Sequence, residues 1–190
     1  MRATTRGSDR VWTAEEFLAT NQYEFGDAWR YELVDGVIVA HDAPAPDHGA
    51  IVAGLTAALG VRLAGRPNDR RPESGGGAAP TQQQRPTARI PNAMIRCGQL
   101  PRVTFDVVSP SELRAWRACD RRRQHLQNIE GVQEVVEIYQ DEAAIHVYRL
   151  GAEGKWSFSA VDGLDAVLSL ESVGFEIPLA EIYQFVSVAG

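Results

Sequence analysis

RVTFDVV at residues 102–108, followed directly by SPSE at residues 109–112, is the stretch of sequence that decides the fold. The first part is rich in valine and predicts a β-strand. The second part places a proline after a serine, as at the start of many helices, and predicts a helix that runs to about Glu130, where Gly131 ends it. A strand that leads directly into a long helix indicates an α/β protein.

The chain after this helix predicts mainly strands. Residues 133–140 and 143–150 flank Asp141 and Glu142 and predict a hairpin. Short strands are predicted at residues 155–161, 166–170 and 175–177, and a closing helical turn at residues 179–185.

The chain before residue 102 predicts a further strand at residues 89–97 and a helix at residues 48–63. This helix is begun by Asp47 and is apolar nearly all round, so we expect it to be buried. Residues 65–87 are rich in proline, glycine and glutamine and predict a loop with one short strand. Its three consecutive glycines do not form a phosphate-binding loop, because no Gly-Lys-Ser/Thr follows them.

Near the amino terminus, WRYELV at residues 29–34 and VIVA at residues 37–40 are joined by an Asp-Gly pair, which predicts a β-hairpin. Strand alternation separates Glu32 from Tyr31 and Leu33, and a lone carboxylate in mid-strand is unusual unless it faces solvent or a site. Thr13 and Glu16 predict a capping box for a short helix that ends at about Ala19.

These elements predict one α/β domain, residues 11–190, with a central mixed β-sheet flanked by helices, after a disordered segment at residues 1–10. No apolar run is long enough to span a membrane, and no apolar run follows the arginines of the amino terminus, so we expect no membrane segment and no secretory signal. Cys97 and Cys119 lack metal-ligand spacing and indicate free thiols, which favours a cytoplasmic protein.

Charge is distributed unevenly along the chain, whose net charge is −6. Residues 61–123 hold thirteen arginines and five acidic residues, a balance of +8, and the remainder carries −14. Such a segregated basic segment is compatible with binding to phosphate groups. The alternative is that these arginines only cover a solvated surface.

Five sequence features together resemble one known family. They are YELVDG at residues 31–36, Asp47-His48, Ile90-Pro91-Asn92, the DVVSPS strand-to-helix junction at residues 106–111, and GVQEVVEIY at residues 131–139. Over residues 11–185 this order resembles the Uma-type restriction endonucleases, a family assigned to the PD-(D/E)xK nuclease superfamily. The resemblance implies a restriction-endonuclease-like fold and hydrolysis of DNA phosphodiester bonds with Mg²⁺.

The resemblance also implies a catalytic set, made of Glu32, Asn92, Asp106 and Arg123, with Glu32, Asp106 and Asn92 as metal ligands. Asn92 stands where the family has an acid. Arg123, counted back from Gly131, stands where the family has a lysine; Val108 occupies the classical lysine position. An arginine stabilises phosphate charge but cannot act as a base. We therefore expect weak or lost activity and weak binding of Mg²⁺, which Asn92→Asp should strengthen. The alternative is a non-catalytic DNA-binding or homo-oligomeric assembly protein, such as a homodimer, that keeps the fold.

Several other residues are candidate accessories. His48 either caps or packs at a helix start, or acts as a ligand or base. Helical spacing places Asp120, Arg123 and Gln127 on one face with Leu113 and Trp116, which we expect to face the sheet. Arg114, Arg117 and Arg121 lie on a neighbouring face and are candidate contacts to DNA phosphate. Ser109 and Ser111 indicate a helix start rather than a nucleophile, because no His/Asp pattern accompanies them. We expect Glu32, Asn92, Asp106 and Arg123 to converge in one cleft.

Overall fold

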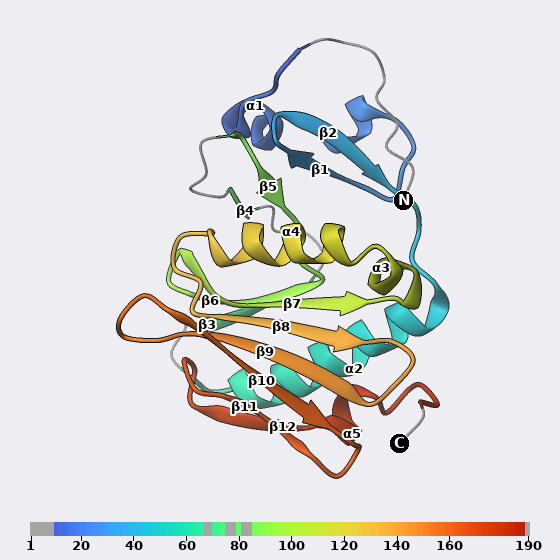
Figure 1. The fold of residues 1–190 in the computed structure, drawn as a ribbon, viewed down its shortest axis with the longest axis vertical. Coiled ribbons are helices and arrows are strands. Elements are labelled where there is room, and N and C mark those ends of the chain that lie inside the picture. The colour runs from blue at the N-terminus through green and yellow to red at the C-terminus, as the bar shows by residue number, and fades with distance from the viewer. Residues whose placement is uncertain (1–9, 67–69, 75–78, 81–84, 189–190) are drawn as a thin grey trace.

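The protein is described by a computed structural model that covers residues 10–66, 70–74, 79–80 and 85–188. A six-stranded mixed sheet, in the order β10-β9-β8-β7-β6-β3, forms its centre. Helix α2 (Pro46–Leu63) packs on one face, and helices α3 (Pro110–Arg114) and α4 (Trp116–Gln127) cover the other (Figure 1). The strands are β3 (Arg70–Ser74), β6 (Ala93–Cys97), β7 (Leu100–Val108), β8 (Glu134–Tyr139), β9 (Ala144–Leu150) and β10 (Trp156–Asp162).

A second, four-stranded sheet lies on the far side of α4 from the central sheet (Figure 1). Its order is β2-β1-β5-β4. Its strands are β1 (Arg30–Val34), β2 (Val37–His41), β4 (Ala79–Pro80) and β5 (Ala88–Arg89), and short helices α1 (Ala14–Ala19) and η1 (Gln22–Phe25) precede them. Helix α4 therefore lies between two sheets, and side chains from both sheets contact it.

Alternation along β7 decides which of its residues reach each face. Val103, Phe105 and Val107 are buried in the main core with α2. Asp106 and Val108 point to the opposite face, where Asp106 contacts α4. Because β7 and β8 pair in parallel, Asp106 lies in register with Glu137.

Helix α2 is buried through Ile51, Leu55 and Leu59, as its apolar sequence predicted. It begins at Pro46, two residues before the predicted start, since proline is well accommodated in a first helical turn. Gly54 allows close packing on α5 (Leu179–Ile182), because a Cβ there would lie 2.3 Å from the Ile182 carbonyl oxygen.

The predicted hairpins are confirmed. β1 and β2 turn at Asp35 and Gly36, both with positive φ, as a tight Asp-Gly turn requires. β8 and β9 form the second hairpin, β11 (Val167–Leu170) pairs with β12 (Phe175–Pro178), and the capping box of Thr13 and Glu16 begins α1. The predicted mixed sheet is also confirmed, but the first hairpin lies outside it, in the smaller sheet.

Three other predictions differ from the structure. The strand expected at residues 89–97 is two strands, β5 and β6, because the chain leaves one sheet at Ile90-Pro91-Asn92 and enters the other. The helix expected at residues 109–130 is interrupted at Ala115 and ends at Gln127. The loop expected at residues 65–87 contains two short strands, β3 and β4, one in each sheet.

The segment expected to be disordered, residues 1–10, lies outside the described residues except for its last position. Over the part of the chain that the structure describes, no helix combines the length and apolarity needed to cross a membrane.

Candidate functional site

Glu32 and Asp106 lie on different sheets and meet at α4. Glu32 is fully buried in mid-strand of β1, and Asp106 is 5% exposed on β7. The residue that joins them is Arg122 of α4, which enters the space between the sheets. The two acids thus converge through a cation supplied by the protein itself.

The guanidinium of Arg122 contacts both carboxylates at once. Its Nη1 donates to Oε1 and Oε2 of Glu32 at 2.8 and 2.7 Å. Its Nε and Nη2 donate to Oδ2 and Oδ1 of Asp106 at 2.5 and 3.0 Å, and Nη2 also donates to the Ile90 carbonyl at 3.0 Å. Burial lowers the pKa of Arg122, but Asp106 and Glu32 outweigh burial and raise that pKa well above its ordinary value.

Glu32 has further donors around it. Arg89 Nη1 donates to Oε2 at 2.9 Å, and the backbone N–H of Ile90 donates to Oε1 at 2.8 Å. His41 Nε2 lies 3.0 Å from Oε2. Burial raises the pKa of Glu32, but Arg122, His41 and Arg89 outweigh it and hold that pKa well below its usual value. Glu32 is therefore ionised and fully engaged.

Asn92 is engaged through both ends of its side chain and through its backbone. Its backbone N–H donates to Asp106 Oδ1 at 3.2 Å, and its Oδ1 accepts from the Val107 N–H at 2.8 Å. Its Nδ2 lies 2.9 Å from Nε2 of His48, which accepts this bond as a neutral imidazole. Burial lowers the pKa of His48.

Arg123 belongs to a neighbouring cluster on the face of β8. It forms ion pairs with Asp120 and, at 3.3 Å, with Glu137, and its guanidinium lies 4.5 Å from the centre of the Tyr148 ring. Burial raises the pKa of Glu137. Gln127 is half-buried, and its side chain forms no hydrogen bond with another described residue. Arg123 therefore lies beside the Glu32–Asp106 pair and does not contact it.

A cleft of about 460 Å³ opens next to this pair, lined among others by Trp29, Arg30, His48 and Asn92. A smaller cavity of about 30 Å³ shares Arg30, His48 and Asn92 with it and extends to a second set of residues. That set includes Asp106, Arg122, Arg123 and Glu137. The side chain of Arg30 makes no hydrogen bond or ion pair with any described residue. Burial and the charge of Arg122 lower the pKa of Arg30. The structure thus brings Asn92, Asp106 and Arg123 to one cavity, while Glu32 lies behind Arg122.

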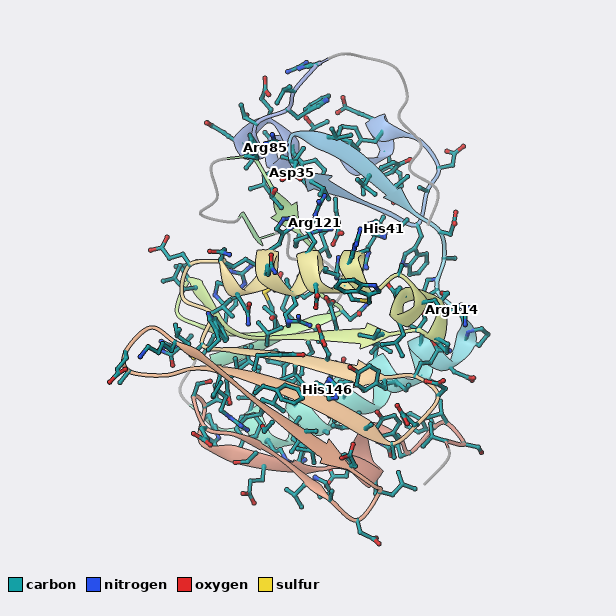
Figure 2. The ribbon with its side chains drawn as sticks, viewed as in Figure 1. Asp35, His41, Arg85, Arg114, Arg121 and His146 are labelled. Atoms are coloured by element: carbon teal, nitrogen blue, oxygen red, sulfur yellow. The ribbon has the colours of Figure 1, made fainter. Side chains whose placement is uncertain are left out.

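The arginines of residues 61–123 do not form one surface. Arg89 and Arg122 are bound to Glu32, and Arg62 is bound to Glu181. Arg114, Arg117 and Arg121 are exposed, as expected. Figure 2 shows Arg121 on the side of α4 that faces the hairpin, where it lies 3.7 Å from Asp35, and Arg114 at the end of α3.

Two apolar residues of this helix were placed wrongly by helical spacing. Leu113 and Trp116 were expected to face the sheet, but they are 38% and 60% exposed. The break at Ala115 rotates α3 against α4, so spacing counted across it does not hold for Leu113, whereas Trp116 is the exposed first residue of α4. Trp116 instead packs at 5.3 Å against the Arg117 guanidinium.

The arrangement does not fit a divalent metal ion. Mg²⁺ requires free oxygen ligands. Each oxygen of Glu32 and Asp106 already accepts from Arg122, and Asn92 Oδ1 accepts from Val107. Among the described residues no group of three or more His, Cys, Asp or Glu side chains could hold a metal ion.

The sequence alone did not indicate six residues of the site: Arg122, Arg89, Arg30, His41, His125 and Glu137. One feature pointed to some of them: a buried mid-strand glutamate needs a cation, and the basic segment is rich in candidates. Spacing from Gly131 indicated Arg123 as the cation of the site instead of its neighbour Arg122. Spacing alone does not show which of three consecutive arginines points between the sheets.

Comparisons with known proteins first define the class. The fold matches a crystal structure described as "a putative nuclease belonging to DUF820" from Anabaena variabilis, with a TM-score of 0.69 and 17% identity. The match covers 91% of this chain and 98% of that chain, so the architecture is that of a nuclease-like fold. Curated proteins gave no match.

The sequence then identifies the family. Residues 14–180 match the Uma2 family, described as "Putative restriction endonuclease", and the chain belongs to this family. The resemblance stated from the sequence and the predicted fold class are both confirmed. Restriction-endonuclease-like families typically use a divalent metal ion, whereas the residues at this site do not fit one as they are arranged here.

Proposed function

We propose that this chain is an endonuclease-family protein that binds DNA in the cleft beside Arg30 and hydrolyses it weakly or not at all. The observation that carries the proposal is the engagement of all four oxygens of Glu32 and Asp106 by guanidinium and backbone donors. Metal-assisted hydrolysis needs such oxygens to hold an ion that activates water and neutralises charge on the phosphate.

The state of the candidate base also supports weak hydrolysis. His48 is neutral and lines the cleft, but its Nε2 already accepts the Asn92 amide. Arg123 stays charged and is bound to Asp120 and Glu137. Phosphodiester hydrolysis would therefore need these contacts to break first.

DNA binding is supported by cations that form no ion pair with any described acidic residue. Arg30 lines the 460 Å³ cleft without an ion pair to any described residue, next to the exposed ring of Trp29. Arg114 and Arg117 extend the positive charge along α3 and α4. Phosphate groups bind such arginines, and the affinity falls as salt rises.

The test measures cleavage and binding separately. We expect no cleavage of plasmid or single-stranded DNA with Mg²⁺ or Mn²⁺ above the background of an Asp106→Asn variant. Metal-dependent cleavage by the wild type that Asp106→Asn abolishes would contradict the proposal that this chain hydrolyses DNA weakly or not at all. Fluorescence anisotropy at about 50 mM salt should show binding to DNA that Arg30→Gln weakens. A folded wild-type protein that binds no DNA under these conditions would overturn the binding part.

A further inference from the structure

We propose that Arg122 takes the place of a divalent cation, and that Glu32, Asp106 and the Ile90 carbonyl become a divalent-cation site when this side chain is removed. The inference rests on the proposed function, because it explains why the carboxylate pair of this chain is closed. It concerns the two acids and Arg122, and it is tested without DNA.

The first support is the chemistry of the atoms around the guanidinium. Arg122 contacts five oxygens: two of Glu32, two of Asp106 and the carbonyl of Ile90. No nitrogen or sulfur acceptor contacts it in the described part of the chain. Two carboxylates with a backbone carbonyl are the ligand types that Mg²⁺ and Ca²⁺ take in proteins.

The second support is charge. Glu32 and Asp106 are almost fully buried, and such acids need compensation by a cation. Arg89 reaches only Glu32, so Asp106 depends on Arg122 alone among the described cations that form ion pairs with it. Removal of Arg122 leaves Asp106 without an ion pair to any described cation, in an oxygen-lined space where a divalent ion would restore the lost positive charge.

The third support is access. Arg122 and Asp106 line the cavity of about 30 Å³, which is roughly the volume of one water molecule. This cavity shares Arg30, His48 and Asn92 with the larger cleft. Truncation of Arg122 to alanine widens it, so a hydrated ion can enter from solvent.

The experiment compares the purified wild-type protein with Arg122→Ala by calorimetry and thermal unfolding, with Mg²⁺, Mn²⁺ and Ca²⁺ added separately. We expect no saturable binding to the wild type. Arg122→Ala should bind about one ion with a Kd of about 10⁻⁴–10⁻³ M, and its Tm should rise with ion concentration. Arg96→Ala is the matched control, because Arg96 also forms a half-buried ion pair, with Glu73, away from this site; it should behave as the wild type.

Two further variants keep the result decisive. Arg122→Ala combined with Asp106→Asn should lose the response, and Arg122→Lys, which retains a cation, should show none. If Arg122→Ala is unfolded without ions, the titration is followed by circular dichroism, and recovery of structure with a divalent ion supports the proposal. No binding and no recovery overturns it, as does tight binding to the wild type. Cleavage of DNA by the wild type bears on the proposed function instead, so the two failures are distinguishable.

Discussion

Asn92 illustrates how one amide holds the site together at the scale of a residue. It connects three parts of the structure: the Val107 backbone on β7, the Asp106 carboxylate and His48 on α2. An amide suits this position because it donates to a neutral histidine with one end and accepts from a backbone N–H with the other. An acid at residue 92 can accept from Val107 but cannot donate to His48.

Asn92→Asp should therefore raise the pKa of His48. A carboxylate oxygen in place of Nδ2, 2.9 Å from Nε2, favours the protonated imidazole, and an opposite charge this close changes a pKa by about one to three. NMR titration of the His48 ring measures this pKa, with His48→Gln to assign the resonance. Asn92→Ser is the neutral control and should not raise it; an unchanged pKa in Asn92→Asp would contradict this geometry.

Helices α3 and α4 show how one element serves two purposes. The inner side of α4 carries Arg122 and His125 into the space between the sheets, whereas Arg117 and Arg121 are exposed, with Arg121 3.7 Å from Asp35. The interruption at Ala115 lets α3 turn away, so Arg114 and Arg121 lie apart (Figure 2). The exposed arginines are the ones available to an external phosphate.

Replacement of Arg114, Arg117 and Arg121 by alanine should weaken DNA binding for all sequences and flatten its dependence on salt. Phosphate contacts carry no base information, so the loss is the same for all sequences. Each contact that is lost also reduces the number of counterions released on binding, which lowers the salt dependence. The free energy of unfolding should change by only about 0.5 kcal/mol per site, since these are surface positions. Binding titrations at several salt concentrations measure the slope.

Arg62 and Arg66 provide the matched control for that experiment, because they are cations of the same basic segment that contact Glu181 and Val173 instead. Alanine at both should leave the salt slope unchanged. A change in oligomeric state on replacing the three exposed arginines, with DNA binding unaltered, would favour the assembly alternative.

At the scale of the whole molecule, the two sheets are held together by a buried ionic network centred on Glu32. Arg89 connects Glu32 to His125. The Nε and Nη2 of Arg89 donate to Nδ1 of His125 at 3.1 and 2.9 Å. Burial and the charge of Arg89 lower the pKa of His125 to about 4. The folded protein therefore requires this histidine to be neutral.

Stability should fall as the pH is lowered below about 6.5. The unfolded chain protonates His125 near its ordinary pKa of about 6.5, whereas the folded chain binds this proton only near 4, so protons favour unfolding between these values. The loss is on the order of 3 kcal/mol, since one pKa unit corresponds to about 1.4 kcal/mol. Glu32, whose pKa is held low in the fold, adds a further loss below about 4.5.

Urea unfolding at pH 7.5 and pH 5 measures the part of this loss that is complete at pH 5, about 2 kcal/mol. His125→Gln keeps an acceptor for Arg89 but cannot be protonated, so most of the difference between the two pH values should disappear. Equal stability of the wild type at both pH values would show that His125 is not held neutral by the fold.

Local sequence determined part of the secondary structure around the site. Periodic apolar residues, the Asp35-Gly36 turn and the capping box of Thr13 and Glu16 act within a few residues, and the structure has each of these elements. The order of elements and their motifs also determined the family and the fold class. Glu32 could be singled out because it is a lone acid in mid-strand, and Asp106 because of the resemblance to the family.

Only the tertiary structure decided what these acids bind. The division of residues 89–97 between two sheets at Ile90-Pro91-Asn92 places α4 between Glu32 and Asp106. The break at Ala115 and the rotation of α4 then decide that Arg122, rather than Arg123, points between the sheets. Adjacent residues on a helix point in directions that differ by about 100°. An error of one position in the sequence therefore separates Arg122, which binds both acids, from Arg123, which lies beside them.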